Sequence, residues 1–195
     1  MRLFNILSIA LTSLTITSFL AGCNQDNFVQ KSSNLIQVSN LTQEEVVPLD
    51  NKMDWKDESK YMLELKKVSI VNSQGVSVSV TNLSEPLFFS AYWCPHCQRT
   101  LVSFDKNKSI IHDEPIVIST GFPPGTTLKQ AVEATNREFH DLGVSGFKTY
   151  YCLSGISSSL VPIFPTIMFH NHDTIHVLVG EHTSSVWNKA FKDQG

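Results

Sequence analysis

Cysteine is scarce in this chain, and basic residues do not outnumber acidic ones. The 195 residues include four cysteines, and 15 Lys and Arg stand against 18 Asp and Glu, for a formal charge of −3. So few cysteines argue against a disulfide framework, and the acidic balance leaves no basic footprint for nucleic acid. The apolar run at residues 3–21 is too short and too rich in Ser and Thr for a membrane span. These absences direct attention to a globular domain with a small number of chemically active thiols.

The first residues predict export from the cytoplasm. Arg2 precedes the apolar run, and Leu20-Ala21-Gly22-Cys23 ends it in a motif that resembles the bacterial lipobox. We therefore expect residues 1–22 to be a lipoprotein signal peptide and Cys23 to be the lipid-attachment residue. An ordinary cleaved signal and an uncleaved anchor are the alternatives, and each places the domain outside the cytoplasm. Loss of Arg2 leaves 14 basic against 18 acidic residues, a formal charge of −4.

The segment that follows is polar. Residues 24–59 are rich in Asn, Gln, Ser, Thr, Asp and Glu and show little periodicity, which is typical of a flexible tether. We assign residues 23–60 to this tether and residues 61–195 to one domain, which is long enough for a proper core.

The tetrad Cys94-Pro95-His96-Cys97 directly follows an apolar run at residues 87–93. Two thiols this close can form and break one disulfide, so the tetrad indicates thiol-disulfide exchange. A strand that delivers Cys94 to the first turn of a helix places its sulfur among unpaired N–H groups and favours the thiolate. His96 can hydrogen-bond to that sulfur or place a positive charge beside it, and either effect favours a disulfide donor. Cys97 lies one turn into the helix, so we expect it to be more buried and to resolve the mixed disulfide.

Zinc binding is the structural alternative for a CxxC pair, but the sequence has no second CxxC. Cys152 and the seven histidines could supply scattered ligands, and His170 with His172 is a suggestive pair. Redox chemistry is the better explanation of the tetrad, so we predict no metal and no organic cofactor. A lipidated Cys23 leaves Cys94, Cys97 and Cys152 as thiols, and one of the three must remain unpaired. Cys152 lies in an apolar and aromatic stretch, where a small buried hydrophobe is expected. A second redox role for it stays open.

Hydrophobic periodicity predicts an α/β domain. Two alternating runs, at 67–71 and 76–80, flank turn residues and predict a β-hairpin. Continuous apolar runs at 87–91 and 115–119 predict buried strands. Three helices are predicted. The first has apolar residues at helical spacing, Cys97, Leu101 and Phe104, and the second begins at a capping box of Thr127 and Gln130 and ends at Gly143. The third follows the cap Thr183-Ser184 and carries Val186, Trp187 and Phe191. A second hairpin is predicted from runs at 166–169 and 174–179.

This order of elements resembles the thioredoxin fold over about residues 66 to 195. The run Ala91-Tyr92-Trp93-Cys94 is similar to the family's approach to its nucleophile, and Phe164-Pro165-Thr166 resembles its cis-proline segment. The resemblance implies a central mixed sheet flanked by helices, with the N-terminal hairpin and the 127–142 helix as additions. It also implies that Trp93, Phe164 and Pro165 contact substrate, with the backbone of Phe164 adding strand-like hydrogen bonds. A trans proline starting an edge strand is the alternative, and Pro162 is the rival candidate.

Two branches of the family share these features. The hairpin and the helical insertion are most similar to the membrane-tethered TlpA/ResA branch, whereas the Cys-Pro-His-Cys tetrad resembles that of the DsbA oxidases. Many members carry a buried acid six residues before the first cysteine or three after the second, and here Phe88 and Thr100 occupy those positions. Glu85 or another acid would have to replace that acid in three dimensions.

The sequence thus predicts an extracytoplasmic thiol-disulfide oxidoreductase, with Cys94, Cys97 and His96 as its catalytic residues. The expected partners are cysteine-containing secreted or envelope proteins, a membrane redox partner and the membrane itself, through the lipid anchor, with no nucleic acid. The tetrad favours oxidation of substrates. Reduction by electrons from a membrane donor is the first alternative, and Cu(I) held by the thiolates in a metallochaperone is the second.

Overall fold

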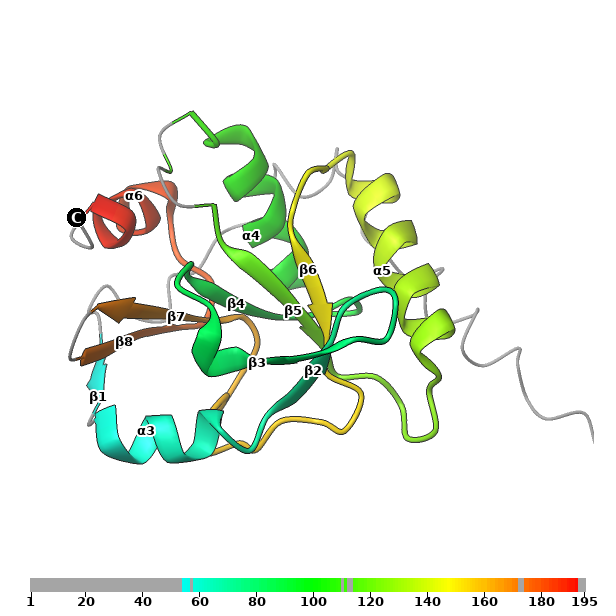
Figure 1. Ribbon diagram of the computed structural model, residues 1–195. Coiled ribbons are helices and arrows are strands. Elements are labelled where there is room, and N and C mark those ends of the chain that lie inside the picture. The colour runs from blue at the N-terminus through cyan, green and yellow to red at the C-terminus, as the bar shows by residue number, and fades with distance from the viewer. Residues whose placement is uncertain (1–53, 57, 110, 112–113, 172–173, 193–195) are drawn as a thin grey trace, which may run out of the picture.

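The computed structural model describes residues 54–56, 58–109, 111, 114–171 and 174–192 (Figure 1). The helices and strands along the chain are β1 (Asp54–Lys56), α3 (Glu58–Leu65), β2 (Ser69–Val71), β3 (Ser77–Ser79), the 3-10 turn η1 (Val80–Asn82), β4 (Leu87–Ala91), α4 (Pro95–Lys106), β5 (Ile116–Thr120), α5 (Leu128–Leu142), β6 (Thr149–Tyr151), β7 (Thr166–Asn171), β8 (Thr174–Val179) and α6 (Ser184–Lys192).

The described strands form one mixed sheet in the order β1-β8-β7-β4-β5-β6-β2-β3. Strands β4, β5 and β6 run parallel, and the remaining pairs are antiparallel. Both predicted hairpins, β2–β3 and β7–β8, are confirmed. Parallel β4 and β5 need a crossover, which α4 supplies, and α5 supplies the next one. The sheet therefore has the predicted α/β architecture.

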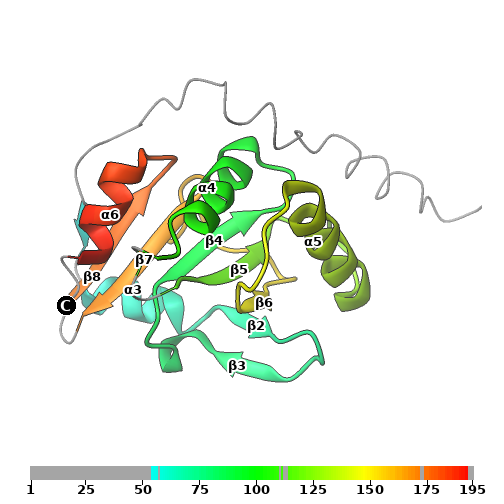
Figure 2. The same ribbon diagram turned by 90° about the horizontal axis from the view of Figure 1, so that it is seen from above.

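Helices α4, α5 and α6 cover one face of the sheet and α3 covers the other, as Figure 2 shows. Neighbouring residues of β4 point to opposite faces: Phe88 packs in the cluster under α4 and α6, and Phe89 packs in the cluster under α3. Every residue of β4 and β5 is buried, so these two strands form the centre of the molecule. Their C-terminal ends present the residues that follow Ala91 and Thr120.

The sheet extends further toward the N-terminus than the predicted domain. Strand β1 pairs with β8, and Tyr61 and Leu65 of α3 lie in the core. Residues 54–56 and 58–60, which we assigned to the tether, thus lie in a strand and in a helix of the structure. Strand β6, which is three residues long, was also not predicted.

The caps of α5 are those that the sequence predicts. The Thr127 hydroxyl accepts a hydrogen bond from the Gln130 backbone N–H, and the Gln130 side chain accepts one from the Thr127 N–H. Gly143 ends the helix with a φ of 67°, a left-handed conformation that glycine adopts without a steric penalty. These caps fix the register of the face that α5 turns toward the sheet.

Candidate active site

Strand β4 and helix α4 together place the cysteine pair. Cys94 is the N-cap of α4, and its backbone N–H donates to the carbonyl of Ala91 at 2.9 Å. Pro95 occupies the first helical turn, where its missing N–H costs nothing. The side chain of Cys97 is fully buried, and Cys94 keeps 6% of its surface exposed. The prediction that Cys97 is the more buried cysteine is confirmed, and both thiols are free in this structure.

The two thiols differ in acidity. A hydrogen bond from Cys97 is the largest cause that lowers the pKa of Cys94, which reaches about 6 although burial acts in the opposite direction. Backbone N–H groups of Cys97 and His96 and the charge of His96 contribute to the same lowering. Burial raises the pKa of Cys97 well above its ordinary value, and the neighbouring Cys94 adds to that rise. Cys94 is therefore suited to be the nucleophile and Cys97 the resolving thiol.

The segment before β7 lies against Cys94. The Phe164–Pro165 peptide bond is cis, as the resemblance implies, and the Cys94 thiol donates to the Phe164 carbonyl at a sulfur–oxygen distance of 3.7 Å. The Pro165 carbonyl accepts a hydrogen bond from the Gly180 N–H at 2.7 Å, and the Thr166 hydroxyl donates to the Ile163 carbonyl at 2.7 Å. These bonds hold the segment in place beside the nucleophile.

Exposed apolar side chains lie close to the nucleophile along the chain. Trp93 is 45% exposed and Ile163 is 43% exposed. The Trp93 indole N–H donates to the Gly121 carbonyl at 2.9 Å, and its ring meets that of Phe164 edge to face with centroids 6.3 Å apart. Trp93 precedes Cys94, and Ile163 precedes the residue whose carbonyl contacts Cys94, so both add apolar surface where a protein substrate could bind.

His96 is oriented by a carboxylate. Its Nδ1 lies 2.6 Å from Oε2 of Glu181, in the segment between β8 and α6. Arg99 binds the same carboxylate through two nitrogens, Nε at 2.8 Å from Oε1 and a terminal nitrogen at 2.8 Å from Oε2. We predicted that the His96 ring would either bond to the Cys94 sulfur or place a charge beside it. The ring is held at Glu181, and the charge of His96 is a smaller cause of the low Cys94 pKa than the Cys97 hydrogen bond and the backbone N–H groups.

A buried acid is present, but it comes from another element. Glu85 forms an ion pair with Lys148 at the surface, at 2.9 Å, so it does not replace the missing acid. Glu138 of α5 is 1% exposed, and burial together with the charge of Cys94 raises its pKa to about 8. One of its carboxylate oxygens, Oε1, has no hydrogen-bond partner in the described part of the chain. Glu138 follows Ala131, Ala134 and Thr135 on the buried stripe of α5, and this spacing was the signal that could have revealed it.

Cys152 is buried, as predicted. It is 1% exposed and lies in the core cluster under α3, apart from the small cluster that holds Cys94 and Cys97. Its thiol donates to the Gly155 carbonyl at 3.4 Å, and burial raises its pKa. These surroundings make it unreactive compared with Cys94.

Several sequence predictions fall outside the described residues, including the signal segment 1–22 and Cys23. Among the residues that the structure does describe, no helix is long and apolar enough to cross a membrane. Within the same ranges, no three His, Cys, Asp or Glu side chains are grouped as metal ligands would be.

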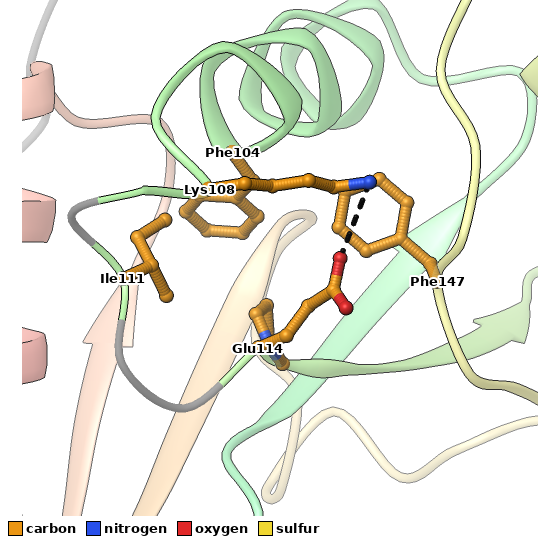
Figure 3. Close-up of a pocket in the computed structure, with 6 residues that line it drawn as sticks. Phe104, Lys108, Ile111, Glu114 and Phe147 are labelled. Atoms are coloured by element: carbon orange, nitrogen blue, oxygen red, sulfur yellow. Dashed lines mark ion pairs between the residues drawn. The ribbon is translucent and has the colours of Figure 1, made fainter.

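A pocket opens at the opposite end of α4 from the cysteine pair (Figure 3). It is lined by Phe104, Lys108, Ile111, Glu114, Pro115 and Phe147. Lys108 forms an ion pair with Glu114 at 3.3 Å and lies over the ring of Phe147. None of the predicted site residues contributes to it.

Sequence comparison finds no relative: no protein-family model and no curated protein matches the chain. Solved structures do match. The structure of MTB dsbF in its mixed oxidized and reduced forms is 18% identical, with 68% of this chain and 97% of that chain covered and a TM-score of 0.50. A secreted Mycobacterium tuberculosis disulfide oxidoreductase homologous to E. coli DsbE is 16% identical, with 67% and 98% covered and a TM-score of 0.51. An uncharacterized thioredoxin-like protein from Porphyromonas gingivalis is 18% identical, with 67% and 91% covered and a TM-score of 0.50. The chain thus has the thioredoxin-like fold that its sequence predicts.

Proposed function

We propose that this protein is an extracytoplasmic thiol-disulfide oxidoreductase that donates its Cys94–Cys97 disulfide to cysteine-containing proteins. The observation that carries the proposal is the asymmetry of the pair: Cys94 keeps 6% of its surface exposed and has a pKa of about 6, whereas Cys97 is fully buried and has a raised pKa. The likeness to a structure described as a secreted disulfide oxidoreductase supports the same function.

The reaction needs no group beyond the two cysteines. A substrate thiolate attacks Sγ of Cys94 in the oxidised protein, the bond between Cys94 and Cys97 breaks, and Cys97 takes up a proton. A second substrate thiolate then attacks the substrate sulfur of this mixed disulfide, and Cys94 leaves as a thiolate. Two electrons pass from the substrate sulfurs to the cysteine pair, and of the two protons lost by the substrate one stays on Cys97 and one enters solvent. A thiol with a low pKa leaves readily, which favours this direction.

The surface around Cys94 supports a protein substrate. The side chains of Trp93, Phe164 and Ile163 give an extended chain apolar contacts, and the 163–165 segment lies beside the sulfur. An extended substrate segment can therefore bind along this segment while its cysteine reaches Cys94.

Reduction of substrate disulfides, supplied with electrons by a membrane donor, is the second candidate. Glu138 favours it, because a buried carboxyl group in the electrostatic field of Cys94 can exchange a proton with the site during reduction. The membrane location belongs to the proposal in both directions: the segment 1–22 directs export, and lipid on Cys23 holds the domain at the membrane.

Oxidative refolding tests the function. Reduced ribonuclease is incubated with the oxidised protein, and the return of ribonuclease activity is followed for the wild type, Cys94→Ala and Cys152→Ser. We expect the wild type and Cys152→Ser to act alike and Cys94→Ala to be inactive. Equal activity of Cys94→Ala and the wild type would overturn the proposal.

A further inference from the structure

The carboxylate of Glu181 joins two distant parts of the fold. Glu181 lies in the segment between β8 and α6, and it receives both His96 and Arg99 from the first turns of α4. His96 and Arg99 are three residues apart, so they share one face of the helix. The side chains of Glu181 and Arg99 are 2% and 7% exposed, whereas that of His96 is 50% exposed. A buried ion pair therefore extends to a residue at the surface of the redox site.

Glu181 and Arg99 meet at one nitrogen of the His96 ring. Nδ1 lies 2.6 Å from Oε2 of Glu181, which is short for a hydrogen bond between nitrogen and oxygen, and 2.9 Å from a terminal nitrogen of Arg99. A guanidinium only donates hydrogen bonds and a carboxylate only accepts them, so the protonation state of Nδ1 decides which of the two it pairs with. In either state the position of the imidazole is set by Glu181 and Arg99.

The first turn of α4 supplies several of the interactions that act on the Cys94 sulfur. They are the backbone N–H groups of His96 and Cys97 and the charge of His96. Each depends on where this turn lies, and Glu181 ties the turn to the segment before α6 at two points, His96 and Arg99. A buried charged pair is costly to form and adds little net stability, so its connection to a half-exposed histidine points to a role in the site.

We propose that Glu181, held by Arg99, is a positioning residue of the redox site. It fixes the ring of His96 and the first turn of α4 so that their N–H groups and charge stay directed at Cys94. This inference rests on the proposed function and adds to it the group that sets how strongly the thiolate is favoured. Glu138, whose pKa the charge of Cys94 raises, belongs to a different element, α5.

The direction in which the pKa of Cys94 shifts distinguishes a positioning role of Glu181 from a direct effect of its charge. Glu181 carries a negative charge near the site, so removing that charge alone would favour the Cys94 thiolate and lower the pKa of Cys94. Releasing His96 and the first turn would act in the opposite direction and raise it. Glu181→Gln removes the charge and keeps the side-chain shape, so the two roles predict opposite shifts.

The test measures the thiolate of Cys94 by its ultraviolet absorbance across pH and, separately, the equilibrium of the cysteine pair with glutathione. The full chain carries Cys23→Ser and Cys152→Ser, so that both readouts report on one pair. We expect Glu181→Gln to raise the pKa of Cys94 from about 6 to about 7, which lowers the equilibrium constant for disulfide donation at pH 7 about fivefold, or about 20 mV. The exposed Glu133→Gln of α5 is the matched control and should change neither value.

A double-mutant cycle tests whether Glu181 acts on Cys94 through His96. His96→Ala should shift both readouts in the same direction as Glu181→Gln, and the effect of Glu181→Gln should be smaller in the His96→Ala background than in the wild type. If Glu181→Gln does not fold, the variant Arg99→Leu with Glu181→Leu removes both buried charges, releases His96 and should give the same rise.

Three results would overturn the inference: an unchanged Cys94 pKa in the folded variant, a lowered one, or full additivity with His96→Ala. Failure of the wild type to equilibrate with glutathione would instead refute the proposed function. The two failures are therefore distinguishable in one set of measurements.

Discussion

Cys94 and Cys97 are chemically different residues although they are three positions apart. The low pKa of Cys94 comes first from the hydrogen bond of Cys97 and then from the backbone of the first turn, while burial keeps Cys97 protonated. A thiolate that is stable in the reduced protein makes the disulfide easier to reduce. This difference supports our proposal that the pair accepts electrons from substrate thiols.

Glu138 gives a pH dependence of stability that can be measured. Burial raises its pKa from 4.5 to about 8, so the folded protein holds a proton on Glu138 that the unfolded chain releases. The contribution of the protonated Glu138 to the free energy of unfolding is fully present below pH 4.5 and is lost as the pH rises through about 8. We expect the unfolding free energy of the reduced wild type, relative to Glu138→Gln, to fall between about pH 5 and pH 8 by on the order of 3 kcal/mol.

Urea unfolding at several pH values checks this prediction. Glu133 is an exposed glutamate on the same helix, so Glu133→Gln should follow the pH profile of the wild type. Parallel profiles for the wild type and Glu138→Gln would show that the Glu138 carboxyl group has an ordinary acidity.

Some residues of the site can be recognised in a local sequence motif, whereas others become neighbours of that motif only in the folded structure. Cys94, His96 and Cys97 are visible in four adjacent letters of the sequence. Glu181 is 85 positions from His96, and no local pattern ties one to the other. The sequence left open which acid could substitute for the one missing at Phe88 and Thr100. Glu138 of α5 is buried, but it can be considered for this role only after the helix has been packed on the sheet.

At the scale of elements, the turn after β5 positions Trp93. Gly121 has a φ of 72°, and a Cβ at this position would lie 3.0 Å from the Ala91 Cβ and 3.3 Å from the Trp93 indole nitrogen. Both distances are shorter than ordinary van der Waals contact. Glycine is therefore required here for two reasons, the backbone conformation and the space that the indole occupies.

Gly121→Ala tests this arrangement, with Gly125→Ala as its control. Gly125 has a φ of 82°, and nothing lies within 4 Å of the position that a Cβ would take there, so it shares the backbone cost without the collision. Both variants should lose about 1 kcal/mol of stability through the backbone conformation, and Gly121→Ala should lose more because of the collision. Only Gly121→Ala should slow the oxidation of a protein substrate, by about threefold or more, since it displaces Trp93. Equal rates for the two variants would show that the position of Trp93 does not affect substrate binding.

Elements with a strong local signal were predicted, and elements without one were not. The capping box and the terminal glycine located α5 to within a residue at its ends, and apolar runs located β4 and β5. Strands β1 and β6 have three residues each. The equally short β2 and β3 were predicted because longer alternating runs flank turn residues there, a signal that β1 and β6 lack. Helix α3 lies in a polar stretch, and only its packing of Tyr61 and Leu65 against the sheet stabilises it.

At the scale of the whole molecule, the functional residues lie together at one end of the sheet. The turn at Gly121, the 163–165 segment and the segment at Glu181 each contact residues 93–96 there. The parallel order of β4 and β5 places the ends of these strands together. The sequence predicted this topology because its order of elements resembles the thioredoxin fold, and the structure added β1 as a further edge strand.

The reduction potential of the Cys94–Cys97 pair tests the central claim most directly. It is measured in the full chain carrying Cys23→Ser and Cys152→Ser, by equilibration with glutathione followed by alkylation and mass counting. We expect a value above about −200 mV, in the direction of the roughly −120 mV of DsbA, because the Cys94 thiolate is stabilised. A value near about −270 mV, that of thioredoxin, would contradict the proposed direction and identify the protein as a reductant.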